Sequence, residues 1–189
     1  YIKTTYKQPF PTFGTTNLGL EYRHDVISPI IALRFWERHS LGISFNYHFQ
    51  RLKINGLENF ATPAFSVDPD NVTNNGYSNS QGFGVTLGYL WEVNESIRAG
   101  VAWQPEQHMQ KFKKYSGFIA NDGEFNIPQH FQFGLSYAFT PCLVFAGDWE
   151  FIKWKKVPML DNDGTFFTSL LGSANGPGFG WKNQYVWKF

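Results

Sequence analysis

The segment from Leu41 to Gln50, LGISFNYHFQ, alternates strictly between two kinds of residue. Every odd-numbered residue is apolar or aromatic, and every even-numbered residue is Gly, Ser, Asn, His or Gln. A repeat of two residues is typical of a β-strand whose two faces meet different surroundings. The odd-numbered apolar positions return over residues 83–93, 97–103, 131–139 and 179–189. The sequence therefore predicts an all-β protein built on a large antiparallel sheet.

The length of these segments separates two kinds of sheet. Strands of soluble sandwiches usually run about 5 or 6 residues, whereas the alternation from Phe83 to Val93 persists over the whole segment. At about 3.3 Å per residue and a tilt near 40°, that strand rises roughly 25 Å, which is the height of the apolar band on an outer-membrane barrel. We therefore expect a transmembrane antiparallel β-barrel.

The amino-acid composition agrees with a barrel and limits the classes of partner that the protein can bind. Aromatic residues make up 19% of the chain, which suits a lipid-facing wall with interfacial girdles. No uncharged apolar run approaches the roughly 18 residues of a transmembrane helix, and a net charge of +1 lacks the basic face that nucleic acid requires. The predicted partner is thus outer-membrane lipid and the predicted location the bacterial outer membrane, with no nucleic-acid partner.

Alternation and turn residues together predict seven strands, at residues 18–36, 41–55, 82–93, 97–112, 127–140, 143–157 and 179–189. The links between these strands are of two kinds. Short links lie at 37–40, 94–96 and 140–142, and long links rich in Gly, Asn, Asp, Ser and Pro lie at 56–81, 113–126 and 158–178. Short turns on one rim and long loops on the other are the layout of an outer-membrane barrel, with the long loops outside the cell.

An odd number of strands suggests that the barrel extends beyond this chain. Single-chain bacterial barrels use even numbers of strands, and an open sheet would leave two unpaired edges in lipid. We therefore expect residues 1–189 to form a single partial barrel domain, with an N-terminal part outside it because the chain begins at Tyr1 without a signal peptide. Tyr185, Trp187 and Phe189 fit either the aromatic ending of many barrels or an interior strand.

Five segments, taken in order, resemble the FadL family, which includes the TodX-like hydrocarbon transporters. They are SPIIALRF, LGISFNYHFQRLKI, residues 82–117, FNIPQHFQFGLSYAFTP and FAGDWEFIKWKKV. The resemblance implies a monomeric 14-stranded barrel, plugged by an N-terminal hatch, that carries long-chain fatty acids or other hydrophobic compounds inward by diffusion. It also implies that residues 18–189 are about the fourth to tenth strands, so that the hatch and the closing strands lie outside this chain.

The resemblance also suggests where a ligand first docks. The loops at 56–81 and 113–126 look like the pair of outer loops that form a hydrophobic groove in that family. The residues that would line the groove are Leu57, Phe60, Phe65, Val67, Phe118, Ile119 and Phe125. The same side chains would serve equally well to pack the two loops together, and the sequence leaves both interpretations open.

A second implied site departs from the family pattern. The inner pocket of the family holds the fatty-acid carboxylate with basic side chains, and Gly56 stands where one arginine is expected. Arg51 or Lys53 would replace that arginine if the strand were shifted in register. The departure makes a neutral hydrocarbon a serious alternative to a carboxylate ligand.

The sequence predicts no catalytic residue, metal site or cofactor. No Ser, His and acid set is seen to converge, and the five histidines lack the spacing of a zinc site. Asp148 and Glu150 fall on the predicted lumenal face, where pairing with nearby lysines is the simpler interpretation. We therefore predict that the chain is not an enzyme. A general porin and a surface antigen or adhesin remain the alternative functions.

Overall fold

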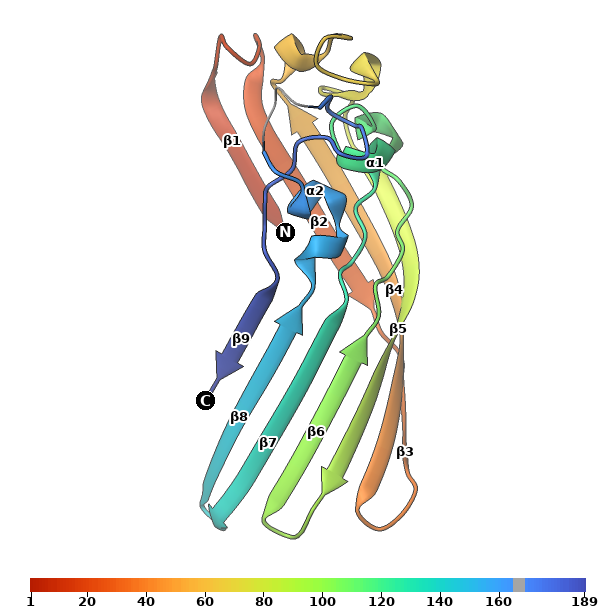
Figure 1. Cartoon of the computed structure of the whole chain (residues 1–189), viewed down its shortest axis with the longest axis vertical. Coiled ribbons are helices and arrows are strands. Elements are labelled where there is room, and N and C mark those ends of the chain that lie inside the picture. The colour runs from red at the N-terminus through yellow and green to blue at the C-terminus, as the bar shows by residue number, and fades with distance from the viewer. Residues whose placement is uncertain (165–168) are drawn as a thin grey trace.

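The computed structural model describes residues 1–164 and 169–189 (Figure 1). Within them, the strands all belong to one antiparallel sheet. The strands are β1 (Ile2–Pro9), β2 (Asn17–Ile27), β3 (Ile30–Arg34), β4 (His39–Asn55), β5 (Ser78–Glu92), β6 (Ile97–Gln104), β7 (His130–Thr140), β8 (Leu143–Ile152) and β9 (Gln184–Lys188). The predicted antiparallel all-β class is confirmed.

Short helices occur only in the long connections of the described chain. They are the 3₁₀ helices η1 (Glu58–Phe60), η2 (Pro69–Asn71), η3 (Lys113–Tyr115) and η4 (Trp154–Lys156), and the α-helices α1 (Ala120–Gly123) and α2 (Pro158–Asp161). No helix in these residues has the length and apolarity that crossing a bilayer would need. The helices therefore serve to shape the connections between strands.

The strand order follows the sequence, β1-β2-β4-β5-β6-β7-β8-β9, with β3 pairing to β4 beyond the end of β2. β2 and β3 keep one register on β4, because Ile27 pairs with Tyr47 and Ile30 pairs with Ser44. The interruption falls at Pro29, which has no backbone N–H to contribute to a ladder. The segment predicted as one strand, 18–36, is thus a continuous path broken at a proline.

One strand, β1, was missed, and three predicted strands were too long: 143–157 ends as a strand at Ile152, 179–189 is a strand only over Gln184–Lys188, and the third is 97–112. β1 was missed because all eight of its residues are exposed, so neither face imposes an apolar alternation on the sequence. The strand predicted at 97–112 ends at Gln104, after which Pro105 begins a segment that leaves the sheet. The sheet therefore has nine labelled strands in the described residues, where seven were predicted.

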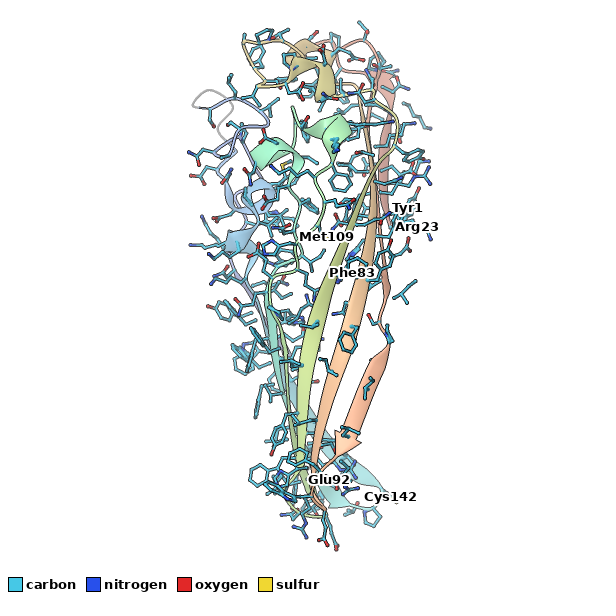
Figure 2. All side chains as sticks on the ribbon, turned by 90° about the vertical axis from the view of Figure 1, so that its right-hand side faces the viewer. Tyr1, Arg23, Phe83, Glu92, Met109 and Cys142 are labelled. Atoms are coloured by element: carbon cyan, nitrogen blue, oxygen red, sulfur yellow. The ribbon has the colours of Figure 1, made fainter. Side chains whose placement is uncertain are left out.

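The sheet is strongly curved. Figures 1 and 2 together show β5 at the bend, with β2 and β4 on one side and β6, β7 and β8 on the other. The short turns gather at one end, and the long connections gather at the opposite end, where they fill the space inside the curve. β1 and β9 form the two edges, and no pairing between them closes the sheet over the described residues.

The convex face carries the apolar wall that the alternation predicts. Large side chains at odd-numbered positions of successive strands are exposed, and Phe83, at 77%, is among the most exposed of them. The wall includes Leu41, Phe45, Phe83, Leu87, Trp91, Phe133, Leu135, Phe139, Phe145, Tyr185 and Trp187. An exposed apolar surface this continuous is typical of a face that meets lipid.

Candidate functional site on the concave face

The concave side of the sheet, which we call the inner face, is the candidate site. Even-numbered residues of β4 point to it, and those nearest the long connections are buried, including Asn46, His48, Gln50, Leu52 and Ile54. From the long-loop end to the short-turn end, the inner face shows three zones in turn. They are an apolar cap, a polar layer and an open groove.

The apolar cap, which we call the cap core, joins β4 to the long connections. Its buried members are Leu52, Ile54, Phe112, Tyr115, Ile119 and Met159, with Leu20, Tyr22, Leu57, Phe118 and Phe125 packed against them. The Tyr115 hydroxyl accepts a hydrogen bond from the Ile54 N–H at 3.0 Å and donates one to the Gly76 carbonyl. Burial raises the pKa of this phenol. Tyr115 therefore ties the end of β4 to two connections at once.

Polar contacts hold the long connections to one another. Ser66 Oγ donates to the Gly117 carbonyl at 2.7 Å, and Ser116 Oγ donates to the Asp68 carboxylate at 2.5 Å. A Cβ placed on Gly117 would lie 1.8 Å from the Asp68 carbonyl oxygen, so this close approach needs glycine. The third connection joins through Leu171, whose N–H donates to the Phe65 carbonyl at 2.8 Å. The connections thus form one packed unit, the loop cap.

The seven apolar residues predicted to line a docking groove fall into two groups. Leu57, Phe118, Ile119 and Phe125 lie in or against the cap core. Phe60 and Phe65 instead extend a row of rings along the rim. The centroid distances are 5.1 Å for Tyr6–Phe10, 6.1 Å for Phe10–Phe13, 5.8 Å for Phe13–Phe60 and 5.5 Å for Phe60–Phe65.

Val67, the seventh of these residues, is 46% exposed, and its N–H donates to the Leu171 carbonyl. The structure therefore brings the predicted residues into one loop cap but into two different surroundings. Packing accounts for the four at the cap core. Phe65 and Val67 remain exposed to a ligand, and the role of the whole set in docking stays a prediction.

Arg51 and Lys53 lie on the other side of the sheet. Both occupy odd-numbered positions of β4, whose pairing with β5 and β2 runs without a shift in register. The Arg51 guanidinium carbon is 3.6 Å from the centroid of the Tyr77 ring, and the Lys53 amine is 5.4 Å from it. The structure therefore does not bring these two basic residues together with the apolar residues of the inner face.

The polar layer lies below the cap core and centres on His48, Gln50 and Gln107. His24 Nε2 and His48 Nδ1 are 2.9 Å apart, and the two rings stack. Both polar side-chain atoms of the buried Gln50, Oε1 and Nε2, have no hydrogen-bond partner within the described chain. Buried polar atoms are normally hydrogen-bonded, so this layer is suited to bind water or the polar group of a solute.

One segment of the loop cap reaches down against β5 to complete the polar layer. The Gln107 N–H donates to the Ile127 carbonyl at 2.9 Å, and the Gln110 N–H donates to the Gln81 carbonyl at 2.8 Å. Gly82 permits this approach, because a Cβ there would lie 2.5 Å from the His108 carbonyl oxygen. The Gly-Phe-Gly sequence at 82–84 was the available signal for this contact, with Phe83 outward and the glycines inward.

The groove below the polar layer has a volume of about 560 Å³. Glycines line it across successive strands, since Gly42 pairs with Gly88 and Gly100 pairs with Gly134. A Cβ added at Gly42, Gly88 or Gly100 would meet no atom nearer than 3.7 Å. These three glycines therefore leave open space on the inner face and do not accommodate a close neighbour.

One charged group on the inner face, Glu150, has two basic neighbours. Glu150 forms an ion pair with the Lys188 amine, and His130 Nε2 lies 3.7 Å from its other oxygen. Within the described ranges, no group of three or more His, Cys, Asp or Glu side chains is placed to hold a metal ion. The inner face thus presents apolar surface, neutral hydrogen-bonding groups and a few charged groups, of which Glu150 and Lys188 are paired and Asp148 lines the groove.

An apolar convex wall, short turns at one end and packed long connections at the other define the outer-membrane β-barrel class of fold. Solved structures of that class are similar to this chain. The Ralstonia pickettii toluene transporter TbuX matches with a TM-score of 0.56 and 13% identity over 75% of this chain and 43% of its own. The Pseudomonas putida toluene transporter TodX matches with a TM-score of 0.50 and 12% identity over 76% and 44%.

A third structure, described as the TodX deltaS2S3 mutant monoaromatic hydrocarbon channel, matches with a TM-score of 0.53 and 15% identity over 82% of this chain and 49% of its own. The chain therefore spans less than half the length of each of these proteins. No family model matches the sequence, and no curated protein does. At such identities the likeness shows the fold, which is that of the TodX and TbuX barrels.

Proposed function

We propose that this chain is part of a FadL-type outer-membrane channel through which uncharged hydrophobic compounds diffuse, with monoaromatic hydrocarbons as the first candidates. The apolar convex wall supports the membrane placement. The likeness to two toluene transporters supports the ligand class. A solute would pass from the loop cap, across the polar layer, into the glycine-lined groove.

The lack of a basic residue in the lining of the groove is the observation that carries the choice of ligand. The residues that line the groove include the carboxylates Asp148 and Glu150 and no lysine or arginine, and Arg51 and Lys53 lie on the convex face. A carboxylate removed from water needs a compensating charge, because an unpaired buried ion is costly. A neutral aromatic ring needs no such partner, so the inner face suits a hydrocarbon better than a fatty acid.

Calorimetric titration of the full-length protein in detergent tests this proposal. Toluene and a long-chain fatty acid are titrated separately, and empty micelles give the partitioning background. Saturable binding of toluene with weak or absent binding of the acid is expected. Binding of the acid alone would contradict the neutral-ligand proposal, and binding of neither would favour a general porin or a surface antigen.

A Gly88→Phe variant tests whether bound toluene lies on the inner face. Gly88 faces the open groove, so the added ring would occupy it without displacing the backbone. Leu87→Phe is the matched control, because Leu87 neighbours Gly88 on the same strand but belongs to the exposed wall. Toluene binding should weaken in the first variant and persist in the second. Equal binding by both would exclude the groove as the site.

A further inference from the structure

A group of charged residues on the convex face, which we call the basic patch, is unused by the proposed channel. It extends over β1, β2, β4 and the residue before β5. Its members are Lys3, Glu21, Arg23, Asp25, Arg51, Lys53 and Tyr77. Directly paired residues of an antiparallel sheet share a face, and Arg23 pairs with Arg51 while Glu21 pairs with Lys53. The patch is therefore one continuous surface.

The basic patch borders the apolar wall on the long-loop side. Phe49 is two residues from Arg51 along β4, so the two side chains are separated by roughly 6.6 Å along the strand. Tyr47 comes next, with its ring 5.0 Å from that of the exposed Phe83. Figure 2 shows Arg23 on the outer side of the sheet and nearer the loop cap than Phe83. Charge thus begins where the apolar wall ends.

The charges of the basic patch do not balance internally. Glu21 lies 3.5 Å from the Lys3 amine and accepts a hydrogen bond from the Tyr77 hydroxyl, and Asp25 lies 2.7 Å from Arg23. Arg51 and Lys53 form no ion pair with any carboxylate of the described residues, although both lie near the Tyr77 ring. Two of the four basic side chains therefore lack an acidic partner.

Arg51 lies directly opposite Arg23, and only Arg23 of the two has a carboxylate partner, Asp25. Residues directly opposite in an antiparallel pair have Cα atoms about 4.5–5.5 Å apart, and like charges in that position destabilise the pairing. A phosphate group between the two guanidinium groups would replace repulsion by charge-assisted hydrogen bonds. The planar fork of arginine matches phosphate geometry. Both side chains are exposed and so accessible to such a group.

We propose that the basic patch binds the phosphate groups of the glycolipid in the outer leaflet, with Arg51 and Lys53 as the principal contacts. The acyl chains of the same molecule would lie on the apolar wall at Phe49, Tyr47 and Phe83. The adjoining wall argues for a lipid phosphate over a free one, because it supplies a surface for the chains. The inference rests on the proposed membrane placement and is independent of which compound the channel carries.

Binding of purified lipid A to the full-length protein in detergent tests this proposal. Diphosphorylated lipid A, its dephosphorylated form and inorganic phosphate are compared by native mass spectrometry. The test variant is Arg51→Gln/Lys53→Gln. The matched control is Lys155→Gln/Lys156→Gln, which removes the same charge from two exposed residues at η4. Toluene binding is measured on the same samples, so that a failure of the channel proposal can be distinguished from a failure of the lipid-binding proposal.

Diphosphorylated lipid A should bind the wild-type protein and the control equally. The Arg51→Gln/Lys53→Gln variant should bind it about 30-fold more weakly, since each basic residue at an anionic membrane surface contributes about fivefold in affinity. Equal affinity in that variant, equal loss in the control, or equal binding of the dephosphorylated lipid would overturn the proposal. Saturation of the patch by inorganic phosphate alone would also overturn the proposal, because the patch would then be a site for a free anion.

Discussion

Gly82→Ala should detach the segment at 107–110 from β5. A Cβ at Gly82 would lie 2.5 Å from the His108 carbonyl oxygen and 2.4 Å from the Met109 sulfur. The sulfur ends a flexible side chain, but the carbonyl is backbone and must move with its segment. Gly88→Ala is the matched control, because it is on the same strand and inner face, and its Cβ would meet nothing nearer than 4.0 Å.

The expected loss of local stability is set by the less costly of two ways in which the structure can accommodate the added methyl group. Forcing an extra methyl group into a packed site typically costs about 1–3 kcal/mol. Releasing the segment instead loses the Gln110 N–H bond to Gln81 and the Ser80 hydroxyl bond to Gln110, at about 1 kcal/mol each. The local stability of the segment should therefore fall by about 1–3 kcal/mol. Gly88→Ala should not lower the local stability of the segment, because its Cβ meets no close neighbour and alanine suits a strand interior better than glycine.

Hydrogen exchange on the full-length protein in detergent measures this loss directly. The amide of Gln110, which bonds to Gln81 of β5, should exchange about 5- to 150-fold faster in Gly82→Ala, while amides of β7 and β8 keep their protection. Unchanged exchange at Gln110 would refute the contact between this segment and β5. Comparable acceleration in Gly88→Ala would refute the claim that close approach at Gly82 is the cause.

Two further variants test the loop cap. Tyr115→Phe should destabilise the protein by about 1–3 kcal/mol, because it leaves the Ile54 N–H and the Gly76 carbonyl without their buried partner. Urea unfolding is the measurement, the exposed Tyr137→Phe is the control, and equal midpoints would contradict the role of the hydroxyl. Phe60→Ser/Phe65→Ser should weaken toluene binding about tenfold while the sheet stays folded. Unchanged affinity with an intact circular-dichroism spectrum would remove the rim rings from the docking surface.

Alternation predicted the central strands well because one face of each meets an apolar environment. β4 to β8 carry the odd-numbered wall, and their cross-strand pairs follow it residue by residue. β1 gave no such signal, since both of its faces are exposed. The segment after Gln104 continues an alternation through Gln107 and Met109, but its partners are the inner face of β5 and residue Ile127 of the loop cap. Periodicity alone does not distinguish these partners from a sheet neighbour.

The candidate site was predictable only in part. Alternation separates the even-numbered polar residues of β4 from the apolar odd-numbered ones, and in the structure His48 and Gln50 lie on the inner face. The same alternation, extended four residues along an unbroken register, places Arg51 and Lys53 outward. Gln107 could not be assigned to the polar layer from sequence, because it comes from a loop whose path depends on the glycines at 82 and 84.

Uptake of labelled toluene tests the central claim, passage along the inner face, most directly. The full-length protein is expressed in bacteria that lack hydrocarbon channels, as wild type, Gly88→Phe and Leu87→Phe, with equal amounts in the outer membrane. Uptake should be faster with the wild type and with Leu87→Phe than in the host, and should fall toward the host level with Gly88→Phe. Uptake at the wild-type rate with Gly88→Phe, or at the host rate with the wild type, would contradict the account.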